Sequence, residues 1–280
     1  MTAGGVVLAG GRSSRMGSPK AWLEWHGSTL LRRTTAVVAR AVDGPVVVVR
    51  AAGQSLPDLP GDVIVVDDPI AGRGPLQGLA VGLDTLAEKV DAAFVCSTDM
   101  PFLHPAFVRS VVAALTDDWD VVLPRTGGFN QPLAAAYRTA LVPAVEELLA
   151  ADRLRPAFLF ETCRTLRLDD VALLSDPALA AADPELASTA NVNDRQEYAA
   201  ARSQPAPLVT VERFGTLADP ARRGPHRVRA ATVDAAARES GLALDRHVVA
   251  ALNGDHIAGE PDVPLATGDT VAFISAHAGG

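Results

Sequence analysis

The sequence predicts an α/β fold with a mostly parallel sheet, followed by a second and smaller β-rich domain. Short unbroken apolar runs, typical of strands buried on both faces, alternate with helical patterns through residues 1–203. A proline-containing linker follows at 204–207, and the pattern then changes to alternating strands around one short helix. We therefore expect one domain over 1–203 and another over 208–280.

The composition limits the partners and the compartment that we expect. The 280 residues are 48% apolar and carry a formal net charge of −8, which argues against a nucleic-acid or anionic membrane surface. The chain opens without a basic leader, and no apolar run approaches the ~20 residues that span a bilayer. Cys96 and Cys163 are too few for a disulfide framework or a cysteine-based zinc site. We expect a cytoplasmic protein with no nucleic-acid or membrane partner.

A Gly-rich and cation-rich loop follows the first predicted strand, at 6–8. It reads Leu8-Ala9-Gly10-Gly11-Arg12-Ser13-Ser14-Arg15-Met16-Gly17-Ser18-Pro19-Lys20. Glycines let the backbone approach a ligand closely, and Arg15 and Lys20 supply positive charge for phosphate oxygens. The Lys20 spacing excludes a Walker loop, and the glycine spacing excludes a dinucleotide fingerprint. We predict a loop that binds a nucleoside triphosphate; a solvated strand-to-helix loop is the alternative.

The use of lysine supports a binding role for this loop. Lys20 and Lys89 are the only lysines of the chain, against a large excess of arginine. Because arginine serves as the cation elsewhere, a lysine at the end of the loop indicates a need for a compact point charge on a flexible stem.

The rest of the first domain alternates predicted helices and strands. Helices are expected at 28–41, 76–86, 105–115, 141–150 and 156–161. Strands are expected at 46–49, 62–66, 92–96, 120–123, 134–137 and 164–168. The Asp- and Ala-rich segment 169–186 is expected to be a surface excursion. Ligands bind at the carboxyl ends of parallel strands, and Asp68 and Asp99 each follow such an end.

Two further stretches suit a nucleotide and its metal. Gly74-Pro75-Leu76 is a Gly-rich turn that opens a helix, which suits an anion or a closely packed base; an ordinary strand-to-helix turn is the alternative. Asp99 directly follows a buried strand and would face the triphosphate loop, so it is well placed to hold Mg²⁺. A turn or N-cap role for Asp99 is the alternative, and Cys96 is expected to be a core residue.

Leu8 to Lys20 resembles the LAGG-x-S-x-RMG-x-x-K signature of nucleotidyltransferases similar to molybdenum cofactor guanylyltransferase. The resemblance implies a three-layer, Rossmann-like domain that uses Mg²⁺ to transfer GMP from GTP to molybdenum-bound molybdopterin. It implies catalytic roles for Arg15, Lys20 and Asp99. It also implies nucleotide contacts at Leu8, Ala9, Gly10, Gly11, Lys20, Asp68, Gly74, Pro75, Leu76 and Asp99.

Other stretches extend this resemblance, with departures. Gly10-Gly11 together with Gly74-Pro75-Leu76 looks like the guanine-framing pair of the family, which favours GTP over CTP. Asn191-Val192-Asn193-Asp194 is similar to the N-V-N-x motif, which implies Asn193 as a second metal ligand; Asp194 is expected to be a helix N-cap. Arg50 and Gln131 stand where the family usually has Asn and His, so the pterin-binding residues stay unassigned.

The second domain has a β-grasp order. Strands are expected at 208–214, 248–253 and 270–275 and a helix at 233–240. With the stretches 249–254 and 265–271 and the terminal Gly279-Gly280, it resembles the ubiquitin-like sulfur-carrier subunit of molybdopterin synthase. This implies a C-terminal thiocarboxylate, with the synthase large subunit and an E1-like adenylating enzyme as partners. The alternatives are an accidental diglycine end, a carrier whose large domain is only a docking platform, and a transferase for another triphosphate or acceptor, such as cytidylyl transfer or a sugar phosphate.

Overall fold

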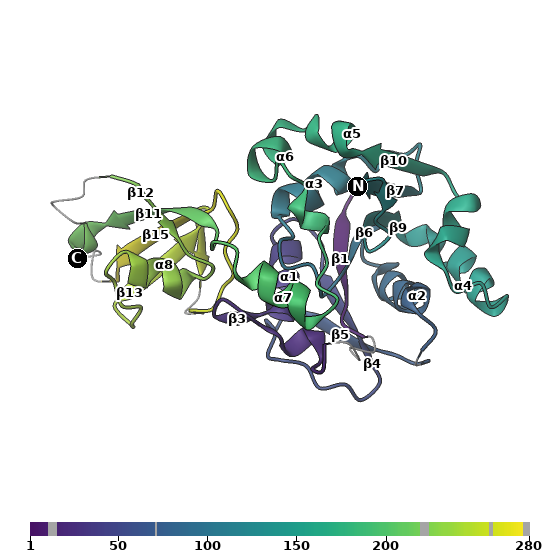
Figure 1. The fold of residues 1–280 in the computed structure, drawn as a ribbon, viewed down its shortest axis with the longest axis horizontal. Helices are drawn as coiled ribbons and strands as arrows, with labels where there is room; N and C mark the ends of the chain where they lie inside the picture. Colours follow the sequence, from purple (N-terminus) through teal and green to yellow (C-terminus); the bar gives the residue numbers. More distant parts are fainter. Residues whose placement is uncertain (11–15, 71, 219–223, 258–259, 277–280) are drawn as a thin grey trace. The chain divides into compact units, whose positions relative to one another are not determined.

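The computed structural model describes residues 1–10, 16–70, 72–218, 224–257 and 260–276 (Figure 1). The chain forms two compact units. The first contains Met1–Leu23 and Leu30–Tyr198, and the second contains Glu24–Thr29 and Ala199–Gly280. The division falls inside helix α7, Arg195–Arg202.

The first unit is built on one large sheet, in the order β10-β7-β9-β6-β1-β4-β5, with β8 paired to β7. The strands are β1 (Ala3–Leu8), β4 (Val46–Ala51), β5 (Ile64–Asp68), β6 (Ala92–Ser97), β7 (Val121–Thr126), β8 (Phe129–Asn130), β9 (Ala134–Arg138) and β10 (Thr165–Asp169). Strand β9 runs antiparallel to β6 and β7, whereas β6, β1, β4 and β5 pair in parallel, as do β7 and β10. The predicted mostly parallel α/β sheet is confirmed.

Helices cover both faces of this sheet and complete three layers (Figure 1). One core holds side chains of α1 (Leu30–Ala39), α3 (Pro105–Ala113), α5 (Asp170–Leu174) and α6 (Pro177–Ala182). The other holds side chains of α2 (Pro75–Leu86), α4 (Val142–Ala150) and the 3₁₀ helix η3 (Pro156–Glu161). Alternate residues of β4 enter opposite cores, Val48 in the first and Val47 in the second, as a strand covered on both faces requires. Across the described ranges, no helix combines the length and the apolar character needed to cross a membrane.

The segment 169–186, expected to be a surface excursion, forms two short helices that pack on the sheet. Asp169 and Asp176 accept hydrogen bonds from the first turns of α5 and α6 and so begin two short helices. Each helix turns one leucine inward, and Leu173 and Leu179 are fully buried against the sheet. The Asp and Ala content hid this packing, because only one residue of each helix is fully buried.

The helix predicted at 28–41 begins later than expected. A hairpin of β2 (Glu24–Trp25) and β3 (Ser28–Thr29) takes its first residues. His26 and Gly27 turn the hairpin with positive φ of 48° and 93°, the conformation of a two-residue hairpin turn. The remaining short helices are η1 (Lys20–Trp22), η2 (Thr139–Leu141), η4 (Ala187–Thr189) and η5 (Gly215–Leu217).

The second unit carries a five-stranded sheet in the order β12-β11-β15-β13-β14. Its elements are β11 (Leu208–Phe214), β12 (His226–Arg229), α8 (Val233–Glu239), β13 (Val248–Leu252), β14 (Asp255–Ile257) and β15 (Thr270–Ser275). The first and last strands, β11 and β15, pair in parallel at the centre, and all other pairs are antiparallel. Helix α8 packs its Ala236 and Ala237 into the core below this sheet. This is the β-grasp arrangement that the sequence predicts, with β12 and β14 added.

Asn253 organises the stretches that suggested this second fold. Asn253 and Gly254, with φ of 54° and 97°, form the two-residue turn between β13 and β14. The Asn253 side chain donates to Asp269 at 2.9 Å and accepts from the Thr270 backbone N–H at 2.9 Å. The two stretches therefore hold each other, and their residues have a structural role.

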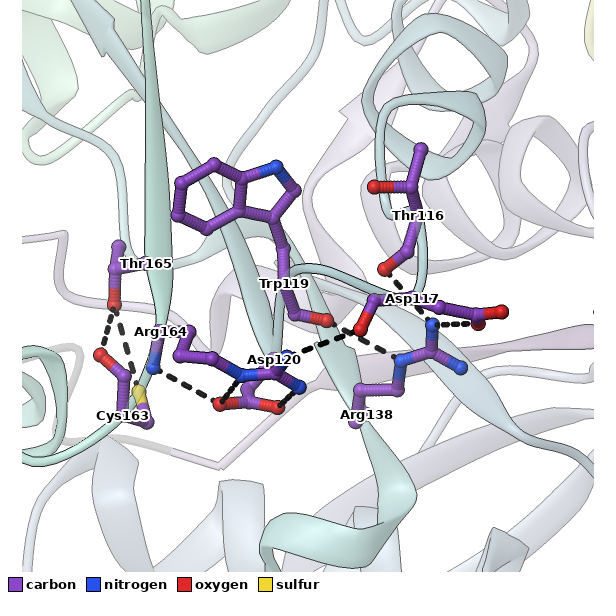
Figure 2. A network of polar contacts seen from close by, with 8 residues as sticks. All are labelled: Thr116, Asp117, Trp119, Asp120, Arg138, Cys163, Arg164 and Thr165. Carbon is purple, nitrogen blue, oxygen red and sulfur yellow. Dashed lines mark hydrogen bonds and ion pairs between the residues drawn. The ribbon is translucent and has the colours of Figure 1, made fainter.

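A polar network closes the amino ends of β7 and β10 in the first unit. Figure 2 shows the Arg164 guanidinium donating hydrogen bonds to the Asp120 carboxylate. Arg138 donates a hydrogen bond to the Asp117 carboxylate. The Arg164 Nη2 and Nε lie 2.6 and 3.1 Å from the two Asp120 oxygens, and these bonds hold the pKa of the Asp120 carboxyl below its ordinary value. The network lies at the edge opposite the carboxyl ends of these strands and fixes the pairing of β10.

Candidate active site

The two candidate loops begin side by side because β1 and β6 are parallel neighbours. Leu8, the last residue of β1, is in register with Ser97, the last residue of β6. Thr98 then ties the two ends together: its backbone N–H and its hydroxyl donate to the Leu8 carbonyl at 3.2 and 3.0 Å. The Gly-rich loop and the Asp99 turn therefore leave the sheet from the same point.

The Asp99 turn is held from two further sides. From α1, the Thr34 hydroxyl donates to the Thr98 carbonyl at 3.3 Å, and the buried Arg33 donates to the Pro101 carbonyl at 2.5 Å. From the segment before α7, the Val192 N–H donates to the Asp99 carbonyl at 2.9 Å. These bonds fix the backbone on both sides of Asp99, so its carboxylate projects from an ordered turn.

Lys20 and Asp99 meet directly. The Lys20 Nζ lies 2.5 Å from Asp99 Oδ2, and the Ser97 hydroxyl donates to the other carboxylate oxygen. The two side chains are 22% and 16% exposed, so the pair is shielded but reachable from solvent. Lys20, the cation predicted from the loop, and Asp99, the predicted acid, are thus in direct contact at the carboxyl edge of the sheet.

The first part of the Gly-rich loop is anchored to β4. Ala9 and Gly10 donate to the Val49 carbonyl at 2.8 and 3.3 Å, and the Gln54 side chain donates to the Ala9 carbonyl at 3.0 Å. A Cβ on Gly10 would lie 3.2 Å from the Ala51 nitrogen, so the glycine permits this close approach. Gly11 and Arg15, also predicted for the site, lie outside the described residues.

The second Gly-rich turn opens α2. Gly74 caps the helix with φ 77° and ψ −174°, a conformation that suits glycine, and Pro75 is its first residue. Leu76 is fully buried, as Leu8 largely is, so a nucleotide contact at either residue would come from its backbone. A Cβ on Gly78 would lie 3.1 Å from Leu8, which shows how closely the start of α2 packs on the end of β1.

Arg50 and Asp68 lie at the end of the β4–β5 pair. Arg50 is opposite Asp67, and its Nε lies 2.6 Å from the Asp67 carboxylate. This ion pair accounts for a cation at the position where the family usually has Asn. Asp68 accepts from the Ile70 N–H at 3.0 Å, which forms a turn directly after β5.

The segment before α7 brings Asn193 near the Asp99 turn through its neighbour Val192. The Asn193 side chain is exposed, and its backbone N–H donates to Glu197 at 2.7 Å. Asp194 accepts from the N–H groups of Gln196 and Glu197, each at 2.9 Å, which confirms it as the N-cap of α7.

The donor set fits a magnesium ion held mainly by substrate. Of the two predicted ligands, Asp99 would supply hard carboxylate oxygens and Asn193 an amide oxygen, and Mg²⁺ commonly takes one or two carboxylates plus substrate phosphates. Within the described part of the chain, no group of three or more His, Cys, Asp or Glu side chains could hold a metal alone. Cys96 adds no ligand: it is fully buried, and burial with the nearby Asp99 charge raises the pKa of its thiol. Cys96 is therefore a core residue, as expected.

A cavity of ≈ 560 Å³ lies at the carboxyl end of β7. The Gln131 amide, the Thr126 hydroxyl and the Thr189 hydroxyl form a chain of hydrogen bonds, each 2.9 Å long, in its wall. Asp170 and Glu185 also line the cavity, and none of its described lining residues is Lys or Arg. Strand β9 alone separates β7 from β6, so these two strands lie about two strand spacings, roughly 10 Å, apart.

Sequence reasoning missed the residues that hold the site. Thr98, Gln54 and Arg195 contact backbone carbonyls of the Gly-rich loop or its strand, but none forms a local motif with its partner. Arg195 stands 179 residues after Met16, the residue it contacts. The only available signal was its place directly after Asn193-Asp194.

Solved structures of other proteins share this fold. Molybdopterin-guanine dinucleotide biosynthesis protein A from Archaeoglobus fulgidus superposes with a TM-score of 0.57 at 18% identity, covering 71% of this chain and 96% of that chain. The 2-C-methyl-D-erythritol 4-phosphate cytidylyltransferase from Thermus thermophilus gives 0.51 at 18% identity, with coverage of 71% and 97%. At such identities the likeness shows the fold alone.

Sequence relatives are closer. A protein of Mycobacterium tuberculosis H37Rv named probable molybdenum cofactor guanylyltransferase is 40% identical over 168 residues, 59% of this chain and 82% of that protein. A Mycobacterium marinum protein of the same name is 39% identical over 178 residues, with coverage of 62% and 85%. The family model of the MobA-like NTP transferase domain matches residues 5–169, which include both partners of the Lys20–Asp99 pair. The chain belongs to the MobA-like NTP transferase family.

Proposed function

We propose that this chain transfers GMP from GTP to the terminal phosphate of molybdenum-bound molybdopterin and releases pyrophosphate. The observation that carries the proposal is the Lys20–Asp99 pair beside a Gly-rich turn at the carboxyl edge of the sheet. Such a place offers a cation for phosphate and a carboxylate for a metal within reach of one nucleotide. The names of the mycobacterial relatives support the choice of nucleotide and acceptor.

The chemistry needs positioning more than proton transfer. An oxygen of the acceptor phosphate forms a bond to the α-phosphorus of GTP, and the bond from that phosphorus to the β-phosphate oxygen breaks. The acceptor phosphate is already anionic, so no strong general base is required. Lys20 and Arg15, with loop N–H groups, would hold the triphosphate in line and balance its charge. Lys20 would exchange its bond to Asp99 for bonds to phosphate oxygens.

The magnesium ion would be held by Asp99 and Asn193 together with the triphosphate. When bound, Mg²⁺ offsets the negative charge that builds on the phosphates during the transfer. Transfer of Lys20 from Asp99 to the phosphates would free the Asp99 Oδ2 oxygen, which the ion pair occupies, for the ion.

The base would lie between the two Gly-rich turns. Gly10 and Gly11 on one side and Gly74, Pro75 and Leu76 on the other would offer backbone groups to guanine. Gly74 has no side chain and Leu76 is buried, which supports close packing of a flat base against the backbone at the start of α2. Asp68 would contact the base, ribose or pterin side from the end of β5.

The cavity beside Gln131 suits the other end of the acceptor. Its carboxylates, Asp170 and Glu185, repel phosphate and favour a group rich in N–H donors, such as an aminopyrimidinone ring. A molecule with its ring in the cavity and its phosphate at the Lys20–Asp99 pair would have to cross the sheet edge from β7 to β6. Gln131→Leu should raise the KM for molybdopterin at least about tenfold and leave the KM for GTP unchanged. An unchanged KM for molybdopterin would show that this cavity does not bind the acceptor.

The overall proposal is tested by incubating the full chain with Mg²⁺, molybdenum-bound molybdopterin and each of the four nucleoside triphosphates. The expected result is pyrophosphate release and a guanine dinucleotide product from GTP alone. Cytidylyl transfer would show another nucleotide preference. Transfer to a sugar phosphate in place of molybdopterin would show another acceptor, and no transfer to any acceptor would leave the large unit as a docking platform.

A second function is favoured by the five-stranded sheet of the second unit. Its strand order and its parallel central pair support a ubiquitin-like sulfur carrier. In that role Gly280 would carry the thiocarboxylate, and the molybdopterin synthase large subunit and an E1-like enzyme would be partners; Gly279 and Gly280 lie outside the described residues. Deleting Gly279 and Gly280 should abolish thiocarboxylate formation, read by mass spectrometry with the adenylating enzyme, and leave GMP transfer intact. Thiocarboxylate formation by the wild-type chain is the required control, and its absence would exclude the carrier role.

A further inference from the structure

Arg195, the first residue of α7, reaches the far end of the Gly-rich loop. Its Nε donates to the Met16 carbonyl at 2.9 Å. The next residue, Gly17, has φ of 72°, and a Cβ placed there would lie 2.2 Å from the Arg195 Nη2. The guanidinium therefore occupies the space beside Gly17 that a side chain would fill, three residues before Lys20.

Arg195 is itself held by the segment that borders Asp99. Asp194 caps the first turn of α7, and Glu197 folds back to the Asn193 N–H at 2.7 Å. Val192, just before them, donates to the Asp99 carbonyl at 2.9 Å. One short segment thus touches the acid of the site through Val192 and the loop that carries its cation through Arg195.

We propose that Arg195 is a positioning residue that fixes the end of the Gly-rich loop, so that Lys20 is already placed for the triphosphate before the nucleotide binds. This inference rests on the proposed function. Without the Met16 anchor, the ligand would have to order the loop itself, and that entropic cost would weaken binding. Arg195 also keeps a positive charge next to the loop, which favours an anionic ligand.

The first test needs no ligand. Hydrogen–deuterium exchange of the full chain is compared for wild type, Arg195→Met and Arg202→Met. Arg202 is a matched control, since it lies in the last turn of the same helix and pairs with Glu24 at 2.6 Å. Arg195→Met should speed exchange of the amides of Met16, Gly17, Ser18 and Lys20 by about tenfold or more, the expected effect of losing one charged hydrogen bond. Arg202→Met should leave these amides unchanged.

The second test separates positioning from mere folding. Arg195→Met should raise the Kd and KM for GTP about tenfold with less than a threefold change in kcat, and Arg195→Lys should recover part of the loss. Gly17→Ala should give a defect at least as large, because its Cβ displaces the guanidinium and a side chain at φ of 72° is strained. The double variant should then be less defective than the two effects added together, since both act on one contact.

Unchanged exchange at residues 16–20 in Arg195→Met, with thermal unfolding like wild type, would overturn the inference. An equal loss in Arg202→Met would also overturn it, because the effect would then belong to the helix. Failure of the proposed function would give a different result from failure of this inference. The wild-type chain would then transfer no GMP, whereas the hydrogen–deuterium exchange comparison would still test the role of Arg195.

Discussion

The Lys20 Nζ lies 2.5 Å from the Asp99 Oδ2, although 79 residues separate the two in the sequence. Their meeting follows from the parallel pairing of β1 and β6, which ends at Leu8 and Ser97. The Thr98 hydroxyl and N–H then hold the two loop starts together at the Leu8 carbonyl. The sheet therefore creates the candidate site, and the side chains complete it.

Asp99 should carry the magnesium dependence of GTP binding. In wild type, adding Mg²⁺ should tighten GTP binding, measured by titration calorimetry, because the ion joins the carboxylate to the phosphates. Asp99→Asn should lose most of this gain, about tenfold or more in Kd. Asp117→Asn is the control, since this carboxylate is fully exposed and lies in the network at the opposite edge. An equal Mg²⁺ effect in wild type and Asp99→Asn would exclude Asp99 as a ligand.

An arginine should not replace Lys20 in GMP transfer. The Lys20 ammonium fits as a point charge 2.5 Å from Asp99, whereas a guanidinium is planar and wider. We expect GMP transfer by Lys20→Arg to fall about a hundredfold, close to the level of Lys20→Met. Steady-state rates of both variants measure this. Wild-type rates in Lys20→Arg would show that any cation serves.

Much of the first unit could be predicted because its strands are covered on both faces. Val46 to Val49 reads as an unbroken apolar run, and the structure places its residues alternately in two cores. The approach of Lys20 to Asp99 was predictable for the same reason, since both follow carboxyl ends of parallel strands. The short elements were not predictable, because α5 and α6 each bury a single leucine.

The contacts that hold the site could not be predicted from local pattern. Arg195 donates to the backbone carbonyl of Met16. Because every residue has such a carbonyl, the sequence contains no signal for this contact. Strand β12 alternates, but it is four residues long and mostly polar. Strand β14 could have been found, since Asn253-Gly254 is a strong hairpin signal directly before it.

Close packing of α2 on β1 makes Gly82 sensitive to substitution. A Cβ on Gly82 would lie 2.4 Å from the Val6 Cγ1, and Val6 is fully buried. Gly82→Ala should lower the free energy of unfolding by about 1–3 kcal/mol, the usual cost of overpacking a core. Gly61→Ala is the matched control, because a Cβ there meets nothing within 4 Å. Denaturant unfolding of both variants measures the difference, and equal stabilities would contradict the observed packing.

Asp120→Asn should destabilise the first unit in a pH-dependent manner. Its hydrogen bonds to Arg164 lower the Asp120 pKa from an ordinary value of 3.8. A carboxyl with a lowered folded pKa contributes stability above its unfolded pKa and loses it as the pH falls through the folded value. The Tm difference between wild type and Asp120→Asn should therefore be constant from pH 7 to about 5 and shrink below about 4. A difference that grows on acidification would contradict this assignment.

We propose that Lys20 and Asp99 form one centre for nucleotidyl transfer. The rate of GMP transfer from GTP to molybdenum-bound molybdopterin, measured in a single turnover with saturating GTP and Mg²⁺, tests it most directly. Asp99→Ala should lower this rate by about a hundredfold or more while its thermal unfolding stays close to that of wild type. A folded Asp99→Ala variant that transfers GMP at the wild-type rate would contradict the claim.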